Sequence, residues 1–137
     1  MNDLFRAFEI SASGMYAQRI RMNTIASNLA NYESYKNTGE PFRKLEVVFR
    51  AVYDPKRVDK GEIPVSVEAI RESDAPFRLI YDPENPRADA NGFVQLPNVD
   101  LAREMVDMIS AVRSYEANLN AFNMTKEMAN RVIELWR

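Results

Sequence analysis

The chain has 137 residues, a formal net charge of -2, and neither cysteine nor histidine. These values exclude disulfides, thiolate nucleophiles and histidine general bases, and the scattered Lys and Arg residues form no basic patch for nucleic acid. We therefore expect no catalytic residue, no cofactor and no metal site, and a protein that is not an enzyme.

The first predicted element is a helix over residues 2–31, with Asn2 or Asp3 as its cap and with Asn28 and Asn31 at its exit. Apolar residues recur along this helix at alternating steps of four and three residues, which is the pattern of a seam between supercoiled helices. The front stripe comprises Met1, Phe5, Phe8, Ala12, Met15, Arg19, Met22, Ala26 and Leu29, and only Arg19 is polar.

Residues 32–97 are rich in turn formers and in short runs of alternating polarity. The alternation over 63–69 predicts a strand with one buried face, and 77–81 is a second candidate strand. The apolar run 45–53 fits either a third strand or a helical turn. Asn91-Gly92 predicts a chain reversal before the apolar run 93–96. The acidic segment 82–92 lacks the ligand spacing of a calcium loop.

The last predicted element is a single helix over residues 99–136, which contains neither Gly nor Pro, with Asn98 as its cap. A second stripe with the same spacing runs along it. This rear stripe comprises Leu101, Met105, Met108, Val112, Tyr115, Leu119, Phe122, Lys126, Ala129, Ile133 and Trp136, and only Lys126 is polar.

The expected fold is mainly α with a small β-rich middle. We predict that residues 1–31 and 98–137 form an antiparallel coiled-coil pair of helices, and that residues 32–97 form a central module of short strands. The expected helix-pairing and assembly residues are Phe5, Phe8, Met15, Met22, Leu29, Leu101, Met105, Met108, Val112, Tyr115, Leu119, Phe122, Ile133 and Trp136. Arg19 and Lys126 either cover apolar surface with their stems or fix the register of pairing.

These patterns leave two functions open. A chain that pairs its own terminal helices can serve as a structural subunit that polymerises through their outer faces. It can also serve as a cytosolic coiled-coil adaptor that forms a closed small oligomer or grips a partner helix. The charged N-terminus predicts no cleaved signal peptide, and no apolar run is long enough to span a membrane.

Two segments carry a family resemblance. Residues 11–31, SASGMYAQRIRMNTIASNLAN, resemble the N-terminal signature of the bacterial flagellar rod, hook and related axial proteins. Residues 91–135 resemble the rear segment of the proximal rod proteins in that family. The motif residues are Ser13, Gly14, Gln18, Arg19, Asn28, Leu29, Ala30, Asn31, Pro97, Asn98, Glu104, Met105, Tyr115, Glu116 and Asn118. The sequence departs from the family pattern at residues 32–38.

The resemblance implies a structural subunit of the flagellar basal-body rod, an axial drive-shaft for motility that polymerises helically in the periplasm. It implies export through the flagellar type III apparatus without signal cleavage, and terminal helices that pair in the inner wall of the tube. The partners that it implies are further copies of the subunit, other rod proteins such as FlgB and FlgF, and the adaptor FliE. No nucleic-acid partner is expected.

Overall fold

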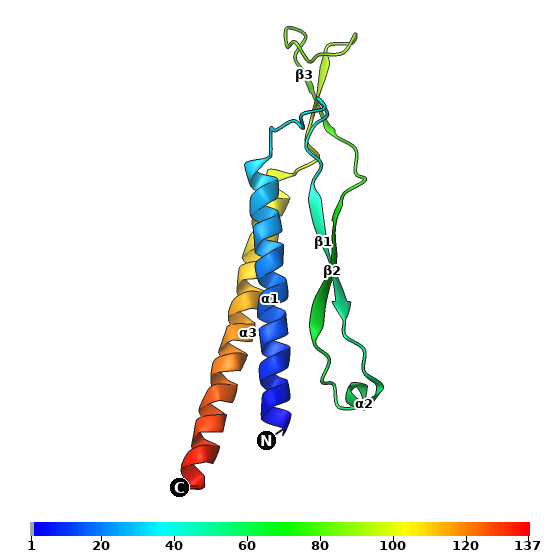
Figure 1. Cartoon of the computed structure of the whole chain (residues 1–137). Coiled ribbons are helices and arrows are strands. Elements are labelled where there is room, and N and C mark those ends of the chain that lie inside the picture. Colours follow the sequence, from blue (N-terminus) through cyan, green and yellow to red (C-terminus); the bar gives the residue numbers. More distant parts are fainter. Residues whose placement is uncertain (1) are drawn as a thin grey trace.

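The computed structural model describes residues 2–137, so Met1 of the front stripe lies outside the described residues. The elements in chain order are α1 (Asn2–Ala30), β1 (Leu45–Ala51), α2 (Pro55–Val58), β2 (Val65–Glu72), β3 (Arg78–Tyr81), β4 (Phe93–Leu96) and α3 (Leu101–Leu135). The two long helices pack side by side and antiparallel, next to small two-stranded sheets (Figure 1). The expected mainly α fold, with a long helix at each end of the chain, is confirmed.

The ends of the long helices are fixed by polar side chains. At the exit of α1, the backbone N–H and the Nδ2 of Asn31 both donate to the Ser27 carbonyl, at 3.1 and 2.8 Å. At the start of α3, the cap is Asp100, whose Oδ1 accepts from the Arg103 N–H at 3.1 Å. The expected cap, Asn98, was wrong. Asn98 is buried and bonds to other segments, and a carboxylate at position 100 suits the positive end of the helix dipole.

Strands β1 and β2 form an antiparallel hairpin in which Leu45 lies opposite Glu72 and Ala51 opposite Val65. The ambiguous run 45–53 is therefore a strand over residues 45–51, and its last two residues lie outside the strand. The second strand starts at residue 65 rather than 63, and its expected buried face is only partly covered. Val67 is half-buried but Ile63 and Ala69 are exposed, because the hairpin lies against α1 without a second layer on its outer side.

Strands β3 and β4 form a second antiparallel hairpin, in which Arg78 lies opposite Leu96 and Tyr81 opposite Phe93. The expected reversal is at Gly92, whose φ of 85° lies in the left-handed region that glycine adopts without strain. A Cβ at this position would lie 2.9 Å from the Tyr81 ring.

The loop that departs from the family pattern, residues 32–38, ties α1 to the β3–β4 hairpin. The Arg78 guanidinium lies 4.0 Å from the centre of the Tyr32 ring and donates to the Tyr32 carbonyl at 2.9 Å. The Tyr35 hydroxyl donates to the Gln95 carbonyl at 2.7 Å, and Arg87 lies over the Tyr35 ring. The two tyrosines therefore anchor the loop to the second hairpin by hydrogen bonds and cation–π contacts.

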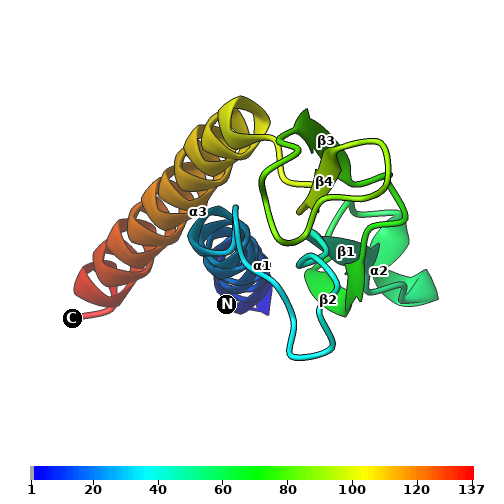
Figure 2. The ribbon, with the colours of Figure 1, turned by 90° about the horizontal axis from the view of Figure 1, so that it is seen from above.

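Helix α1 lies between α3 and the β1–β2 hairpin (Figure 2). The Val65 N–H donates to Ser13 Oγ at 3.1 Å, near the middle of α1. Near the start of α1, the guanidinium of Arg57 from α2 donates to both carboxylate oxygens of Glu9, at 2.8 and 3.3 Å. Among the helices and strands, α3 packs against α1 alone. Helix α1 is thus covered on two sides, and α3 on one.

Within residues 2–137, few large apolar side chains are buried. The buried aliphatic residues are Ala17, Ile25, Val94, Val99 and Ala111, and Pro97 is buried beside them in the chain. Most of the larger apolar residues of the helices are half-buried or exposed, so one copy of the chain leaves much of its apolar surface in contact with water.

The bond between Glu9 and Arg57 predicts that attachment of α2 depends on pH. The Arg57 hydrogen bond lowers the pKa of Glu9 below its ordinary value of 4.5, and the same bond raises the pKa of Arg57. The attachment is therefore fully present above pH 4.5 and is lost as the pH falls through the lowered pKa. The amide protection factors of residues 54–60, which compare the observed exchange rate with the intrinsic rate at the same pH, should fall in that acidic range. In a Glu9→Gln variant this fall should be absent, and an identical pH response in the variant would contradict the assignment.

Candidate functional site

The seam between the two long helices uses small and polar residues as much as apolar ones. On α3, the residues at alternating steps of four and three that are buried or half-buried are Glu104, Met108, Ala111, Tyr115, Asn118, Phe122, Thr125, Ala129 and Val132. The aromatic contact at the lower part of this seam joins Phe122 to Phe8 of α1, with ring centroids 4.8 Å apart. This line differs from the rear stripe at every second position.

The rear stripe divides into two lines. Met108, Tyr115, Phe122 and Ala129 are half-buried in the seam. The remaining apolar members, Leu101, Met105, Val112, Leu119, Ile133 and Trp136, are exposed. We refer to Met105, Val112, Leu119 and Ile133, which repeat along one side of the seam, as the α3 flank. Lys126 is exposed in the same line.

The front stripe divides in the same way. Phe8, Met15, Met22 and Leu29 are half-buried, whereas Phe5, Ala12, Arg19 and Ala26 are exposed. The Arg19 guanidinium lies 5.4 Å from the centre of the Tyr16 ring. The predicted stripes thus follow the edge of the seam, because the other line of the seam carries residues such as Glu104, Asn118 and Thr125, which a search for apolar spacing passes over.

The two helices are in close contact at Gly14. A Cβ at Gly14 would overlap Oδ1 of Asn118, so any larger residue would displace this side chain. Asn118 Nδ2 also donates to the Ser114 carbonyl at 2.8 Å. The glycine therefore makes room for an amide that is fixed on the facing helix.

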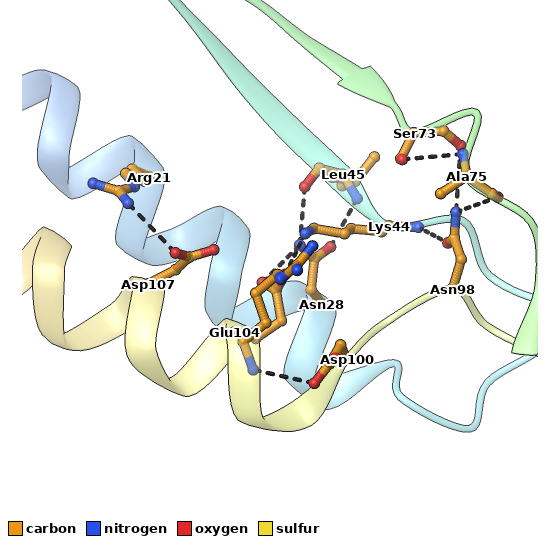
Figure 3. A network of polar contacts seen from close by, with 11 residues as sticks. Arg21, Asn28, Lys44, Leu45, Ser73, Ala75, Asn98, Asp100, Glu104 and Asp107 are labelled. Atoms are coloured by element: carbon orange, nitrogen blue, oxygen red, sulfur yellow. Dashed lines mark hydrogen bonds and ion pairs between the residues drawn. The ribbon is translucent and has the colours of Figure 1, made fainter.

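A buried polar network joins the two helices to β1 (Figure 3). The Asn28 side chain pairs with the backbone of Leu45: its Nδ2 donates to the carbonyl and its Oδ1 accepts from the N–H, both at 2.9 Å. Asn28 Nδ2 also donates to Glu104 Oε2 at 3.2 Å. The other oxygen of Glu104, Oε1, lies 2.8 Å from Lys44 Nζ, and the Glu104 side chain is 1% exposed. One amide and one carboxylate thus connect α1, α3 and the start of β1.

Asn98 extends this network toward the second hairpin. Its Oδ1 accepts from the Lys44 N–H at 2.7 Å, and its Nδ2 donates to the Ala75 carbonyl at 2.9 Å. The Ser73 N–H donates in turn to the Lys44 carbonyl at 2.8 Å. Asn98 therefore holds together the segments before β1, after β2 and before α3 (Figure 3).

The network brings together three motif residues that are far apart in the chain, Asn28, Asn98 and Glu104. Gly14 and Asn118, two further motif residues, meet in the seam. Lys44, which balances the charge of Glu104, is not among the residues predicted from the sequence. A lysine next to a strand carries no signal of its own, since its role depends on a carboxylate 60 residues away in the chain.

The polar network and the helix seam hold segments of the chain together. Within residues 2–137 there is no group of three or more acidic side chains arranged to hold a metal ion. Over the same residues, no helix has the length and hydropathy needed to cross a membrane.

The comparisons with known proteins agree with the motifs. The family described as flagellar basal body rod FlgEFG protein C-terminal matches residues 90–135, and the family described as flagella basal body rod protein matches residues 8–33. The chain is 61% identical to the flagellar basal-body rod protein FlgC of Aquifex aeolicus, with all of both chains covered. It is 44% identical to FlgC of Salmonella typhimurium and 40% identical to FlgC of Bacillus subtilis, in each case over 96% of this chain and 97% of the relative.

Because Lys44 and Glu104 balance each other's charge, we predict that their contributions to the free energy of unfolding are coupled. Replacing Lys44 by Met leaves a buried carboxylate without its cation, and we expect this to lower the free energy of unfolding by about 3 kcal/mol. The double variant Lys44→Met/Glu104→Met should be more stable than Lys44→Met alone, because it removes both charges. Urea unfolding followed by circular dichroism measures both. If the double variant lost as much free energy of unfolding as the two single variants combined, the two side chains would not be coupled.

The contact between Gly14 and Asn118 predicts a second coupled pair. We expect Gly14→Ala to destabilise the helix pair by about 1 kcal/mol, because displacement of Asn118 outweighs the gain of about 1 kcal/mol in helix propensity. In Gly14→Ala/Asn118→Ala the obstacle is gone, and stability should return at least to that of the unchanged protein. A Gly14→Ala variant that melts at a higher temperature than the unchanged protein would refute the close contact.

Proposed function

Because the chain belongs to the FlgC family of flagellar basal-body rod proteins, we propose that the α3 flank is the surface through which it is built into the rod. The chain is a structural subunit of the flagellar basal-body rod and is not an enzyme. Family membership does not identify the residues that contact neighbouring subunits, so the proposal for the α3 flank rests on exposure and packing.

The observation that carries the proposal is the distribution of exposed apolar residues. Half of the large apolar side chains that are exposed in the described residues lie on α3 or at its end. Four of them form the α3 flank, which runs parallel to the seam and which no further helix or strand within residues 2–137 covers. A helix of a neighbouring subunit can therefore lie along this flank and meet apolar residues at helical spacing.

The size of the flank supports polymerisation with several neighbours. Burial of a fully exposed large apolar side chain contributes about 1.5 to 3 kcal/mol. Because the four residues of the flank are 37–55% exposed, their burial contributes roughly 3 to 6 kcal/mol in total. Association of two proteins costs an estimated 4 to 15 kcal/mol in lost freedom of motion. A single contact along the flank is thus marginal. A helical polymer, in which each copy touches several neighbours, gains enough burial to be stable.

Helix α1 supplies a second, smaller surface. Ala12, Met15, Tyr16, Arg19 and Tyr115 line an open hollow of about 190 Å³ that can receive a side chain from a neighbour. Arg19 here and Lys126 beside the α3 flank interrupt otherwise apolar lines. We propose that they disfavour shifted pairings between subunits, since a shift would place a charge against an apolar residue.

We also propose different roles for different parts of the chain. Residues 1–31 and 98–137 would form the helical pair that polymerises, and residues 32–97 would form an outer module that contacts neighbours. Supporting this role, the β3–β4 hairpin exposes Leu79, Ile80, Tyr81 and Phe93 at its surface.

Membership of the family supports partners among the rod proteins. We propose that these include further copies of this chain, rod proteins such as FlgB and FlgF, and the adaptor FliE, and that the terminal helices line the inner wall of a periplasmic tube. We propose also that the flagellar type III apparatus exports the chain without cleaving a signal. The alternative of a cytosolic adaptor has no support from the relatives, which are rod proteins.

A charge in the middle of the α3 flank should block assembly without unfolding the chain. Leu119 is 37% exposed, so Leu119→Asp should keep the helical content of the monomer and cost little stability. In a subunit contact it would bury a carboxylate, and we expect cells that carry it to lack rods and motility. Electron microscopy of basal bodies and a motility assay measure these effects.

The matched control is Asn120→Asp, which introduces the same carboxylate one residue along α3, at an exposed position outside the flank. It should leave rods and motility normal. Normal rods with Leu119→Asp, or equal loss with both variants, would rule out the α3 flank as the assembly surface.

A further inference from the structure

The turn between β3 and β4 contains the single Asn-Gly pair of the sequence, Asn91-Gly92. An asparagine that precedes a glycine is especially prone to deamidation, because glycine has no side chain to hinder attack of its backbone nitrogen on the asparagine side chain. Asn91 is exposed, so water reaches its amide. The sequence of the turn therefore favours a slow chemical change at Asn91, and the geometry of the turn determines how fast it proceeds.

Deamidation at this pair is a ring closure followed by hydrolysis. The Gly92 nitrogen forms a bond to Cγ of Asn91, and the bond between Cγ and Nδ2 breaks. Nδ2 leaves as ammonia and takes the proton that the Gly92 nitrogen loses. Water then opens the resulting cyclic imide at either of its carbonyls, which leaves aspartate or isoaspartate at position 91. In isoaspartate the main chain runs through the side-chain carbon, so the backbone becomes longer.

The attacking nitrogen is engaged in the folded turn. The Gly92 N–H donates to the Asp89 carbonyl at 3.0 Å. Gly92 is also buried, and the Tyr81 ring and Pro83 lie against the position that a Cβ would occupy. Ring closure requires this nitrogen to give up its proton, and here a hydrogen bond holds the proton inside the hairpin, away from base in the solvent.

The backbone of the turn also holds the nitrogen in the wrong place for attack. Ala90 and Asn91 are the central residues of a hydrogen-bonded β-turn and neither has a positive φ, which identifies a type I turn. In this turn the second central residue has a ψ of about 0°, which places the next nitrogen beside its own nitrogen. Ring closure needs the Gly92 nitrogen beside the Asn91 Cβ instead. The nitrogen must therefore leave its place in the turn before it can attack.

Asp89 fastens this turn. Its Oδ1 accepts from the N–H groups of Asn91 and Phe93, both at 2.9 Å. Its own N–H donates to the Phe93 carbonyl at 2.9 Å, and the Asp82 N–H donates to the Gly92 carbonyl at the same distance. Opening of the turn thus breaks several hydrogen bonds together, which keeps the reactive arrangement rare in the folded hairpin.

We propose that the turn fastened by Asp89 protects Asn91 from deamidation, so that Asn91 is stable in the folded hairpin and is modified when the hairpin opens. The inference goes beyond the proposed function, since it concerns the chemical durability of the chain and not its contacts with other subunits. Modification adds a carboxylate beside Asp89. In the isoaspartate form, the longer backbone also disturbs the pairing of Tyr81 with Phe93 at the end of the hairpin.

Comparison of the folded and unfolded chain tests the protection. The full chain is kept at mildly alkaline pH with and without urea, and peptide mass spectrometry measures deamidation at each asparagine. We expect Asn91 to react at least about tenfold faster in urea, because the Gly92 nitrogen is then free to rotate and is open to base. Equal rates at Asn91 in the folded and the unfolded chain would overturn the proposal.

Asn37 is the internal control in the same samples. It is exposed and lies in a turn closed by the hydrogen bond from the Gly39 N–H to the Lys36 carbonyl, but Thr38 follows it. The branched side chain of Thr38 hinders attack whether or not the chain is folded, so Asn37 should react slowly in both conditions. An increase at Asn37 as large as that at Asn91 would show a general effect of urea and would overturn the role of the turn.

Substitution of Asp89 provides the second arm. In the folded chain, Asp89→Ala should raise the rate at Asn91 about tenfold, because two hydrogen bonds that hold the turn closed are lost. Asp89→Asn is the matched control, since it keeps an Oδ1 acceptor in the same place and should react about as slowly as the unchanged chain. Circular dichroism checks that both variants keep their helices. Equal rates in the two variants, or an unchanged rate in Asp89→Ala, would overturn the role of Asp89. Rod assembly takes no part in either arm, so failure of the proposal leaves the proposed function standing.

Discussion

The rest of the structure depends on the buried pairing of Asn28 with the backbone of Leu45 and with Glu104. The Asn28 amide bonds the edge of β1 as a neighbouring strand would, and so fixes where the first hairpin leaves α1. Glu104 brings α3 to the same point, and Lys44 balances its charge. Buried polar groups are costly unless every partner is in place, so this junction permits one arrangement of the three segments.

The helix pair uses different residues for packing within the chain and for the contacts that we propose between chains. Its internal seam uses a glycine, small residues and satisfied polar groups, such as Gly14, Asn118 and Thr125. Large apolar residues such as Phe8 and Phe122 are half-buried in the seam, and others remain exposed beside it on the α3 flank. Small residues let two helices of one chain lie close together, and the apolar surface remains available for neighbouring subunits.

Spacing in the sequence predicts the long helices, the strands and the reversal at Gly92, because these follow from local periodicity and turn chemistry. It misplaces the cap of α3, since Asn98 and Asp100 are equally suitable as caps by type. Only the burial of Asn98 among Lys44 and Ala75 decides between them. It also finds the edge of the helix seam rather than its centre, because the second line of the seam on α3 includes the polar residues Glu104, Asn118 and Thr125. The tyrosine anchors at 32 and 35 depend on arginines far along the chain and leave no local signal.

The attachment of the first hairpin to α1 has a mechanical consequence. Bonds at Glu9, Ser13 and Asn28 fasten the hairpin to the helix at points spread over 19 residues, about 28 Å of its length. A force that bends or twists α1 must then also deform the hairpin, so the helix and the hairpin resist deformation together. In a rotating shaft, such bracing lets a thin helix transmit torque without buckling.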